Sequence, residues 1–291
     1  MLIQTRYPLE RAGVKLRLDR LALDEFEQKR EILLVHGVTY SSHEYDLAYE
    51  DYSLARFLAG RGYGVWRLDI AGFGLSDEPE NGFLPDSDYA AEDICAALER
   101  IAELTGREKI DLLGWSWGTV TAGRCCARHP EHVDRLVLYA PILSGLGEIP
   151  VEEPYHHNTW AHAAEDFQRR PDGSLDTELT DPVILELYCS SCWHYDGERS
   201  PNGGRRDIYV SRERRLIPLE DISVPALLIC GDRDPYLDYE RLDGALALLP
   251  PGSALEVIPG GAHVLMLEKP FYHDFQARLA AFLDGGERGE P

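Results

Sequence analysis

The sequence predicts an α/β fold with a mainly parallel β-sheet. Short runs of consecutive apolar residues recur along the chain, as expected of strands that are buried on both faces of such a sheet. Longer stretches of helical character separate these runs, and the alternation of the two is typical of strand–helix–strand units. The length of 291 residues suits one large domain, or one core that carries a sizeable insertion.

The elements follow in chain order. Near the N-terminus Val14, Leu16 and Leu18 alternate with polar residues, which predicts a half-exposed strand. The predicted buried strands are Ile32–Val35, Leu112–Leu113, Leu136–Tyr139 and Ala226–Cys230, and Leu255–Ile258 is also strand-like. The predicted helices are Tyr89–Leu104, Gly118–Arg128 and Phe271–Leu283.

One stretch, 143–215, breaks this alternation. It is interrupted by prolines and glycines, and it holds four of the ten histidines (His156, His157, His162 and His194) and two of the five tryptophans (Trp160 and Trp193). We interpret it as a cap inserted between two sheet strands, because ligands of open α/β sheets bind beyond the carboxyl ends of the strands. The alternative is a connecting subdomain whose aromatic residues form only its own small core. The core would then comprise 1–142 and 216–284, followed by a flexible tail, 285–291.

The charge balance excludes some classes of partner. Acidic residues outnumber Lys and Arg by 51 to 29, which gives a formal net charge of −22. Such a surface repels phosphate backbones and anionic headgroups, so we expect neither nucleic acid nor membrane as a partner. The N-terminal residues are not a basic stretch leading into an apolar run, and no apolar run is long enough to span a bilayer. We therefore expect a cytoplasmic protein with reduced cysteines.

The strongest chemical signal is Gly114-Trp115-Ser116-Trp117-Gly118, which follows a predicted strand and opens a predicted helix. This is the context of a nucleophile elbow, in which a sharp turn presents the serine hydroxyl clear of the sheet. Bulkier residues at the two glycine positions would collide with the turn. The N-terminal amides of the new helix would favour negative charge developing near the serine. Ser116 is therefore the candidate nucleophile.

A serine nucleophile needs a base, and the base needs an orienting carboxylate. His263 lies on a loop just past the strand-like Leu255–Ile258, where it can reach a serine beyond a neighbouring strand. Asp234 follows the Ala226–Cys230 strand and is the candidate acid, with Asp232 and Asp238 as competitors in the same loop. The chain order serine, acid, histidine also fits the order of one known class of hydrolases.

The oxyanion of a tetrahedral intermediate needs hydrogen-bond donors. One is the backbone N–H of Trp117, the residue after the nucleophile, and the second comes from a loop after an early strand. His36-Gly37-Val38 follows the Ile32–Val35 run. Gly37 would let the backbone approach the serine, so the N–H of Val38 is the second candidate donor.

Together these motifs resemble the α/β-hydrolase superfamily over nearly the whole chain. Besides the elbow, the acid loop and the histidine loop with its following Glu268-Lys269-Pro270, the His36-Gly37 loop and the turn Asp69–Ser76 resemble family motifs. The resemblance implies an eight-stranded sheet with helices on both faces and a cap after the sixth strand. It also implies Val38 and Trp117 as the oxyanion donors. A serine at 116 argues against epoxide hydrolases and haloalkane dehalogenases, which use an aspartate there.

The subfamily is less sharply indicated. The stretch from Ser53 to Leu58 with Gly62 to Trp66, and Thr119 after the elbow, resemble the acid lipases over a short length. Trp115 and Trp117 stand where the family more often has smaller or polar residues. We expect Trp117 either to crowd the acyl pocket or to pack beneath the cap.

Several other groups are weighed as sites. Cys189, Cys192 and His194 suggest a metal, but no second pair of ligands has suitable spacing, so we expect buried thiols and no metal. Arg205-Arg206 could clamp a substrate carboxylate, but a solvated cap surface is the more economical interpretation. Tyr40, Trp160 and Trp193 are our candidates for shaping an apolar acyl pocket.

The sequence thus predicts a serine hydrolase that cleaves a carboxylic ester, with lactones or thioesters as variants. It needs no cofactor and acts on a small, apolar acyl substrate. Two alternatives remain open at this stage. One is a C–C hydrolase or lyase that uses the same three residues. The other is a non-catalytic small-molecule receptor on the same fold, although a receptor has no need of such a set.

Overall fold

The computed structural model describes residues 1–23 and 30–285. Within these residues one eight-stranded sheet forms the core, in the strand order β1-β2-β4-β3-β5-β6-β9-β10. The β1–β2 and β2–β4 pairs are antiparallel and all other pairs are parallel. The strands are β1 (Ile3–Arg11), β2 (Val14–Ala22), β3 (Arg30–Val35), β4 (Tyr63–Asp69), β5 (Ile110–Trp115), β6 (Val133–Tyr139), β9 (Ala226–Gly231) and β10 (Ala254–Ile258).

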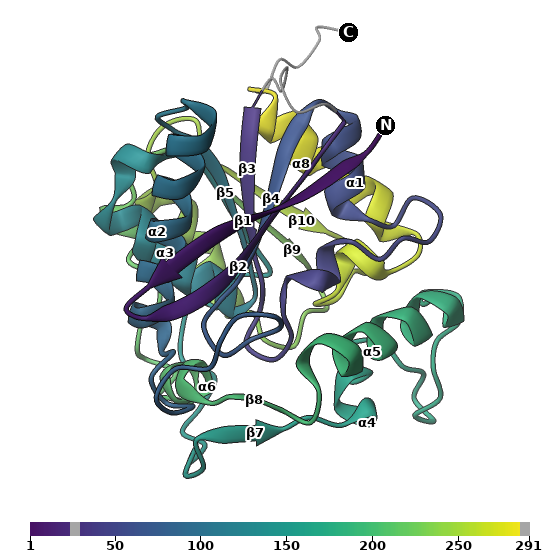
Figure 1. The fold of residues 1–291 in the computed structure, drawn as a ribbon. Helices are drawn as coiled ribbons and strands as arrows, with labels where there is room; N and C mark the ends of the chain where they lie inside the picture. The colour runs from purple at the N-terminus through teal and green to yellow at the C-terminus, as the bar shows by residue number, and fades with distance from the viewer. Residues whose placement is uncertain (24–29, 286–291) are drawn as a thin grey trace, which may run out of the picture.

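Helices cover both faces of the sheet. In Figure 1, α2 and α3 lie on one face, and α1 and α8 lie on the other. Each face has its own set of buried apolar side chains, as expected for a sheet whose strands are apolar on both sides. The helices of the core are α1 (Leu54–Gly60), α2 (Ser87–Thr105), α3 (Trp117–Arg128), α7 (Tyr239–Ala245) and α8 (Phe271–Leu283). Short 3₁₀ turns complete the core: η1 (Ser42–Tyr45), η2 (Pro130–His132), η3 (Leu219–Asp221), η4 (Leu246–Leu248) and η5 (Leu265–Leu267).

The predicted cap after the sixth strand is confirmed. Between β6 and β9 the chain forms a layer at one end of the sheet, drawn in teal and green in Figure 1. Its elements are β7 (Tyr155–His157), α4 (Trp160–Ala163), α5 (Pro182–Asp196), β8 (Arg199–Pro201) and α6 (Gly203–Ile208), with β7 and β8 paired antiparallel. The buried face of α5, including Ile184 and Tyr188, joins the apolar cluster that contains Tyr45 and Trp115 of the core. The cap therefore does not pack only upon itself.

A carboxylate fastens the cap to the core. Asp196, at the end of α5, accepts hydrogen bonds from the Ser41 amide (3.1 Å) and hydroxyl (3.2 Å) and from the Gly74 amide (3.0 Å). Both partners lie on loops that follow sheet strands. Because one side chain spans two core loops, it fixes the position of α5 over the carboxyl ends of the strands.

The expectation of a half-exposed β2 is wrong. Lys15 is the one exposed residue of this strand, and the polar residues Arg17 and Asp19 are buried. Arg17 reaches Asp19 at 2.6 Å and Asp69 at 3.1 Å, so ion pairs rather than water satisfy its guanidinium. Alternating polar residues predict an exposed strand face only when no other part of the chain covers that face. Here the loops after β3 and β4 cover the polar face of β2.

Most of the tail predicted at 285–291 lies outside the described residues. Gly285, its first residue, donates its amide hydrogen to the Phe282 carbonyl at the end of α8. No helix of the described chain is both long and apolar enough to cross a membrane. All six cysteines are free thiols and are buried.

Candidate active site

Ser116 occupies a strained turn between β5 and α3. Its φ of 57° and ψ of −123° lie outside the regions that L-residues prefer, a conformation that costs on the order of 1–3 kcal/mol and recurs at functional sites. The turn is held because the Ser116 amide donates to the Tyr139 carbonyl at 3.0 Å and the Thr119 amide donates to the Ser116 carbonyl at 2.9 Å. The helix α3 begins at the next residue, Trp117.

Glycines allow the backbone to close around this turn, as predicted from the motif. A Cβ on Gly114 would overlap the carbonyl of Gly118, and a Cβ on Gly118 would lie 2.6 Å from the carbonyl oxygens of Val35 and His36. Those neighbours are backbone atoms and cannot move aside. The first turn of α3 therefore lies directly against the end of β3.

The loop after β3 lies beside the serine. A Cβ built on Gly37 would stand 3.4 Å from the Ser116 Cβ and 3.9 Å from its Oγ, so any larger residue there would narrow the site. The side chain of His36 holds this loop in place through two hydrogen bonds. Its Nε2 accepts from the Ile70 amide at 3.1 Å, which leaves the proton on Nδ1 to donate to the Gly37 carbonyl at 2.8 Å. Val38, the next residue, lines the same cavity as Ser116.

His263 is held by both its side chain and its backbone. Its Nδ1 donates to Asp234 Oδ2 at 2.8 Å, and both side chains are almost fully buried. Its carbonyl oxygen accepts from the Trp115 indole at 3.1 Å and from the Tyr139 hydroxyl at 3.0 Å. Trp115 directly precedes Ser116 in the chain, so the histidine is fixed against the strand that carries the serine.

Two effects act in opposite directions on the pKa of His263. Burial disfavours the charged imidazolium, but the charge and hydrogen bond of Asp234, together with the charges of Asp166 and Glu268, outweigh it, and the pKa lies above the ordinary value. Since the hydrogen bond to Asp234 occupies Nδ1, the lone pair of a neutral ring lies on Nε2. The ring is thus arranged to accept a proton at one nitrogen while the other holds it in place.

The structure separates the three aspartates that the sequence left in competition. Asp234 is the one that contacts His263. Asp232 accepts from the Gly260 amide at 2.6 Å, and Asp238 accepts from the Ser144 hydroxyl at 2.7 Å and from the Arg241 amide at the start of α7. Both competitors therefore have structural partners of their own.

A cavity of about 80 Å³ lies between the core and the cap and has Ser116 and His263 in its wall. Core residues on the wall include Val38, Thr39, Tyr40 and Trp115, and cap residues include His162, Glu165, Asp166, Tyr188, Arg205 and Tyr209. Acids, an arginine and tyrosines therefore face the interior. The wall is more polar than the apolar acyl pocket that the sequence suggests.

Of the three aromatic residues predicted to shape the pocket, one lines the cavity and two do not. Tyr40 lines the cavity, and its ring packs edge-on to Tyr188 with centroids 6.1 Å apart. Trp160 and Trp193 do not line it; they are 49% and 47% exposed on the outer side of the cap. Their presence in the sequence does not reveal which side of α4 or of α5 faces the core.

Trp117 follows the second of its two expected roles, packing beneath the cap. Its side chain is fully buried and donates to the Ser87 hydroxyl at 2.9 Å. A Cβ on Gly204 of α6 would stand 2.6 Å from the indole ring, so the two are in close contact. Since this side chain is directed away from the cavity, the backbone amide is what remains of Trp117 for an oxyanion.

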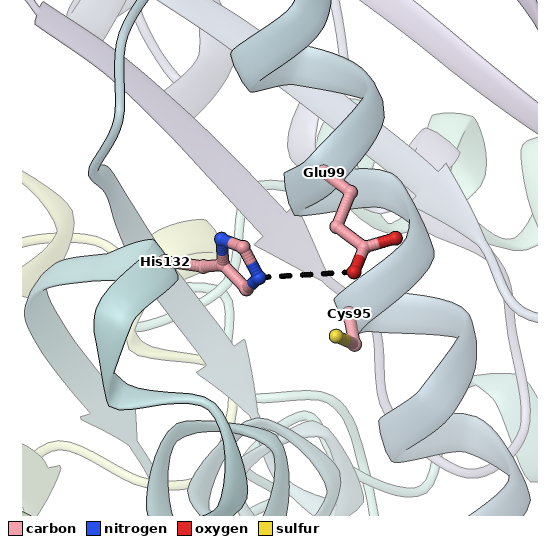
Figure 2. A group of neighbouring side chains, drawn as sticks. All are labelled: Cys95, Glu99 and His132. Atoms are coloured by element: carbon pink, nitrogen blue, oxygen red, sulfur yellow. Dashed lines mark ion pairs between the residues drawn. The ribbon is translucent and has the colours of Figure 1, made fainter.

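One group in the described chain has the donors to hold a metal ion, and it lies away from this cavity. Cys95 and Glu99 stand one turn apart on α2, and His132 faces them from η2 (Figure 2), with their ligand atoms all within 4.8 Å of one another. The His132 ring is 3.8 Å from the Glu99 carboxylate. Cys189 and Cys192 are instead buried thiols on α5, where burial raises the pKa of each.

Sequence reasoning missed the residues that support the predicted ones. Trp115 and Tyr139 hold the His263 carbonyl, and Glu268 accepts from the Ala262 amide at 3.0 Å in the same loop. Glu268 was visible in the family-like segment after the histidine. The other two carry no signal, because their role depends on the pairing of β5 with β6, in which Trp115 lies opposite Tyr139.

This sheet, its cap and a serine at the strand–helix turn define an α/β hydrolase, a hydrolytic enzyme. Residues 27–270 match the family described as Serine aminopeptidase, S33, and the chain belongs to that family. It is similar to the proline iminopeptidase of Lactobacillus delbrueckii subsp. bulgaricus, with 32% identity over 274 residues that cover 84% of this chain and 87% of that protein.

Relatives with lower sequence identity are named for other hydrolytic activities. The carboxylesterase YbfK of Bacillus subtilis is 25% identical over 228 residues, which cover 77% of this chain and 72% of that protein. The crystal structure of epoxide hydrolase A from Mycobacterium thermoresistibile has a TM-score of 0.68 at 19% identity and covers 97% of this chain and 99% of that one. This structural likeness shows the shared fold alone.

Proposed function

We propose that this protein is a serine hydrolase that cleaves a carboxylic ester through an acyl-enzyme intermediate. Ser116 is the nucleophile, His263 the general base and acid, and Asp234 the carboxylate that orients the histidine. The observation that carries the proposal is the strained Ser116 turn next to a buried His263–Asp234 pair. The backbone carbonyl of His263 is held by the indole of Trp115, the residue that precedes Ser116. An ordinary glycine-rich turn has no need of these features.

Each step of the proposed reaction is assigned to a named atom of these residues. Ser116 Oγ attacks the carbonyl carbon and passes its proton to His263 Nε2, while the carbonyl oxygen becomes an oxyanion that accepts from the amides of Val38 and Trp117. The bond to the leaving alcohol breaks as His263 returns the proton to it. Water then attacks the acyl-enzyme with His263 again as base, which releases the acid and restores Ser116. Each amide donor is expected to contribute about 3 kcal/mol to the transition state.

Residues 143–215 are the cap of this enzyme in our proposal, and 1–142 with 216–284 are the core. The cap closes the cavity and supplies much of its polar wall. The cavity volume of about 80 Å³ fits a small substrate and not a long acyl chain. We therefore favour short, polar esters, lactones or thioesters over the apolar acyl substrate expected from the sequence.

Hydrolysis of a peptide bond is the second candidate. The family described as Serine aminopeptidase and the relative named proline iminopeptidase favour it, and Glu165 and Asp166 on the cavity wall could face a substrate amine. The steps are the same with an amine as leaving group. Epoxide opening is less well supported, because the residue at the turn is Ser116.

The test is a pre-steady-state assay with 4-nitrophenyl butanoate and, in parallel, proline 4-nitroanilide. Where deacylation is slower than acylation, an ester hydrolase releases a burst of nitrophenolate equal to the enzyme concentration, and in either case Ser116→Ala abolishes the turnover. Turnover of the anilide alone would select the peptidase. If Ser116→Ala hydrolyses the ester as fast as the unmodified protein, the proposal is wrong. Failure to turn over either substrate, with Ser116 still reactive towards an organophosphorus probe, would favour the C–C hydrolase or lyase alternative.

A further inference from the structure

A buried positive charge forms part of the cavity wall. Arg205 of α6 is 4% exposed, and its guanidinium donates only to uncharged oxygens. Nη1 lies 3.3 Å from the Val38 carbonyl, 3.3 Å from Ser200 Oγ and 3.4 Å from Asn202 Oδ1, and Nη2 lies 2.6 Å from Thr39 Oγ1. A guanidinium carries five N–H donors, and these four contacts involve only Nη1 and Nη2.

The other buried arginines are treated differently. Arg17 lies 2.6 Å from Asp19, Arg20 lies 2.8 Å from Glu31, and Arg67 lies 3.4 Å from an aspartate. Among the residues that the structure describes, no carboxylate lies within 4.0 Å of Arg205. It is thus the one buried arginine of the described chain without an ionic partner, and the one that faces the cavity.

Burial does not remove this charge. It lowers the pKa of Arg205 to about 10, so the guanidinium remains protonated at neutral pH. A buried charge is tolerated when an opposite charge and good hydrogen bonds accompany it. A cation that the protein leaves unneutralised in its cavity wall is therefore suited to an anionic part of a ligand, and a planar guanidinium suits a planar carboxylate.

Glu44 and Asp166, two acids of the same wall, do not pair with Arg205. Burial raises the pKa of Glu44 well above its usual value, which favours the uncharged form of this side chain. Asp166 accepts from the Tyr236 hydroxyl at 3.1 Å, and the Tyr236 ring packs against His263 with centroids 4.7 Å apart. Asp166 is therefore fastened on the side of the histidine, whereas Arg205 is fastened to the Val38–Thr39 loop. The charge of Asp166 still acts on Arg205 and opposes the lowering of its pKa, but the two side chains form no ion pair.

We propose that Arg205 binds a carboxylate of the substrate. The proposal rests on the proposed function: the ester that Ser116 cleaves carries a second, ionised carboxyl group a few bonds from the reacting carbonyl. The short separation follows from the contacts, because Arg205 holds the loop whose Val38 amide is the oxyanion donor. Monoesters of short dicarboxylic acids have this chemistry.

The binding test does not depend on turnover. Calorimetry with Ser116→Ala measures the dissociation constants of butanoate and of its neutral match butanamide. We expect butanoate to bind at least tenfold more tightly, and Arg205→Gln in this background to weaken butanoate roughly 30-fold or more without changing butanamide. Arg205→Lys should fall between, since it keeps the charge but not the fork. Thermal melting checks that each variant is folded.

The matched control is Arg206→Gln, which removes the same charge from the exposed face of the same helix. It should leave the butanoate dissociation constant within twofold. Equal binding of butanoate and butanamide, or equal losses in Arg205→Gln and Arg206→Gln, would overturn the anion site.

A kinetic comparison then tests the substrate. Three 4-nitrophenyl esters with acyl chains of similar length carry a terminal carboxylate (glutarate), a methyl group (pentanoate) or a cation (4-trimethylammoniobutanoate). The anionic ester should have the highest kcat/KM, and Arg205→Gln should lower that value alone. Equal losses on all three would assign Arg205 to loop positioning and overturn the proposal, and so would preference for the cation. If carboxylates bind but no ester is cleaved and Ser116 resists an organophosphorus probe, the proposed function fails while the anion site stands.

Discussion

The two sides of the cavity are built in opposite ways. On the sheet side, each reactive group has several partners from different strands: Asp234 and two hydroxyl or indole donors hold His263, and backbone bonds to β6 and α3 hold Ser116. On the cap side, Arg205 relies on uncharged oxygens, and Asp196 joins α5 to two core loops. The sheet side thus holds the side chains to which we assign bond cleavage in several directions, whereas the cap presents one buried guanidinium that no carboxylate of the described chain pairs with.

The largest predicted effect follows from a substitution on the sheet side of the cavity. Asp234→Asn leaves the shape of the site but removes the charge that orients and stabilises the His263 imidazolium. By analogy with the aspartate of the serine protease triad, kcat should fall by about 10⁴-fold. Steady-state assays with the ester measure this loss. The aspartates that have partners of their own provide the control, and Asp232→Asn should retain activity within a few fold.

The pH profile sharpens the same prediction. The base must be neutral, so kcat/KM should rise with pH through the pKa of His263, which lies above its ordinary value of 6.5. In Asp234→Asn the ring loses its nearest negative charge and hydrogen-bond acceptor, while burial still disfavours its charged form, so the rise of the residual activity should move to lower pH. A profile that stays in place would mean that Asp234 does not control the titration of His263.

A smaller effect concerns the fastening of the cap. Burial, and then the nearby charge of Asp69, raise the pKa of Asp196 to about 7, far above its value of 3.8 in an unfolded chain. The folded state therefore binds the proton more tightly, and this stabilisation, complete below about pH 4, is lost as the pH rises towards 7. Thermal melting between pH 5 and pH 8 should show falling stability. In Asp196→Asn this part of the pH dependence should disappear, and a change of about 1–3 kcal/mol in unfolding free energy is expected from the altered hydrogen bonds.

Tyr40→Phe should affect stability still less. The Tyr40 hydroxyl is buried with no hydrogen-bond partner in the described chain, so its removal costs no internal bond. The free energy of unfolding should change by less than about 1 kcal/mol, with stabilisation as the favoured sign. If this hydroxyl contacts substrate, KM rises while the melting temperature holds. Marked destabilisation would show that the hydroxyl has a structural partner.

The smallest effects are expected on the outside of the cap. Trp160→Ala and Trp193→Ala remove half-exposed rings that do not line the cavity, so each should change the free energy of unfolding by about 0.5 kcal/mol or less. Neither should change KM by more than about twofold. A tenfold increase in KM for either variant would return that tryptophan to the substrate pocket and contradict the observed placement.

The fold was predictable where the sheet is buried on both faces. The runs at 32–35, 136–139 and 226–230 lie within β3, β6 and β9, and the predicted helices correspond to α2, α3 and α8. β1 and β4 were not predicted, since β1 is half exposed along its length and Gly64 and Arg67 interrupt the apolar pattern of β4. In the folded chain the side chain of Glu31 fills the space beside Gly64, and Asp46 forms an ion pair with Arg67. Neither contact can be recognised from the sequence of the strand.

The site shows the same division. Short motifs indicated Ser116, His263 and Asp234, because a serine at a strand–helix turn and polar residues after buried strands can be recognised locally. The character of the cavity could not be inferred, because it depends on how the cap docks. Arg205 and Arg206 are neighbours of identical chemistry, yet one is buried against the core and the other is exposed. Only the path of α6 over the Val38–Thr39 loop distinguishes them.

Labelling with a fluorophosphonate probe, followed by peptide mass spectrometry, tests the central claim most directly. The account predicts one equivalent of label, attached to the peptide that contains Ser116, with loss of the label in Ser116→Ala and strong slowing in His263→Ala. A protein that remains unlabelled under conditions that modify a known serine hydrolase, or that carries its label on another residue, would contradict it.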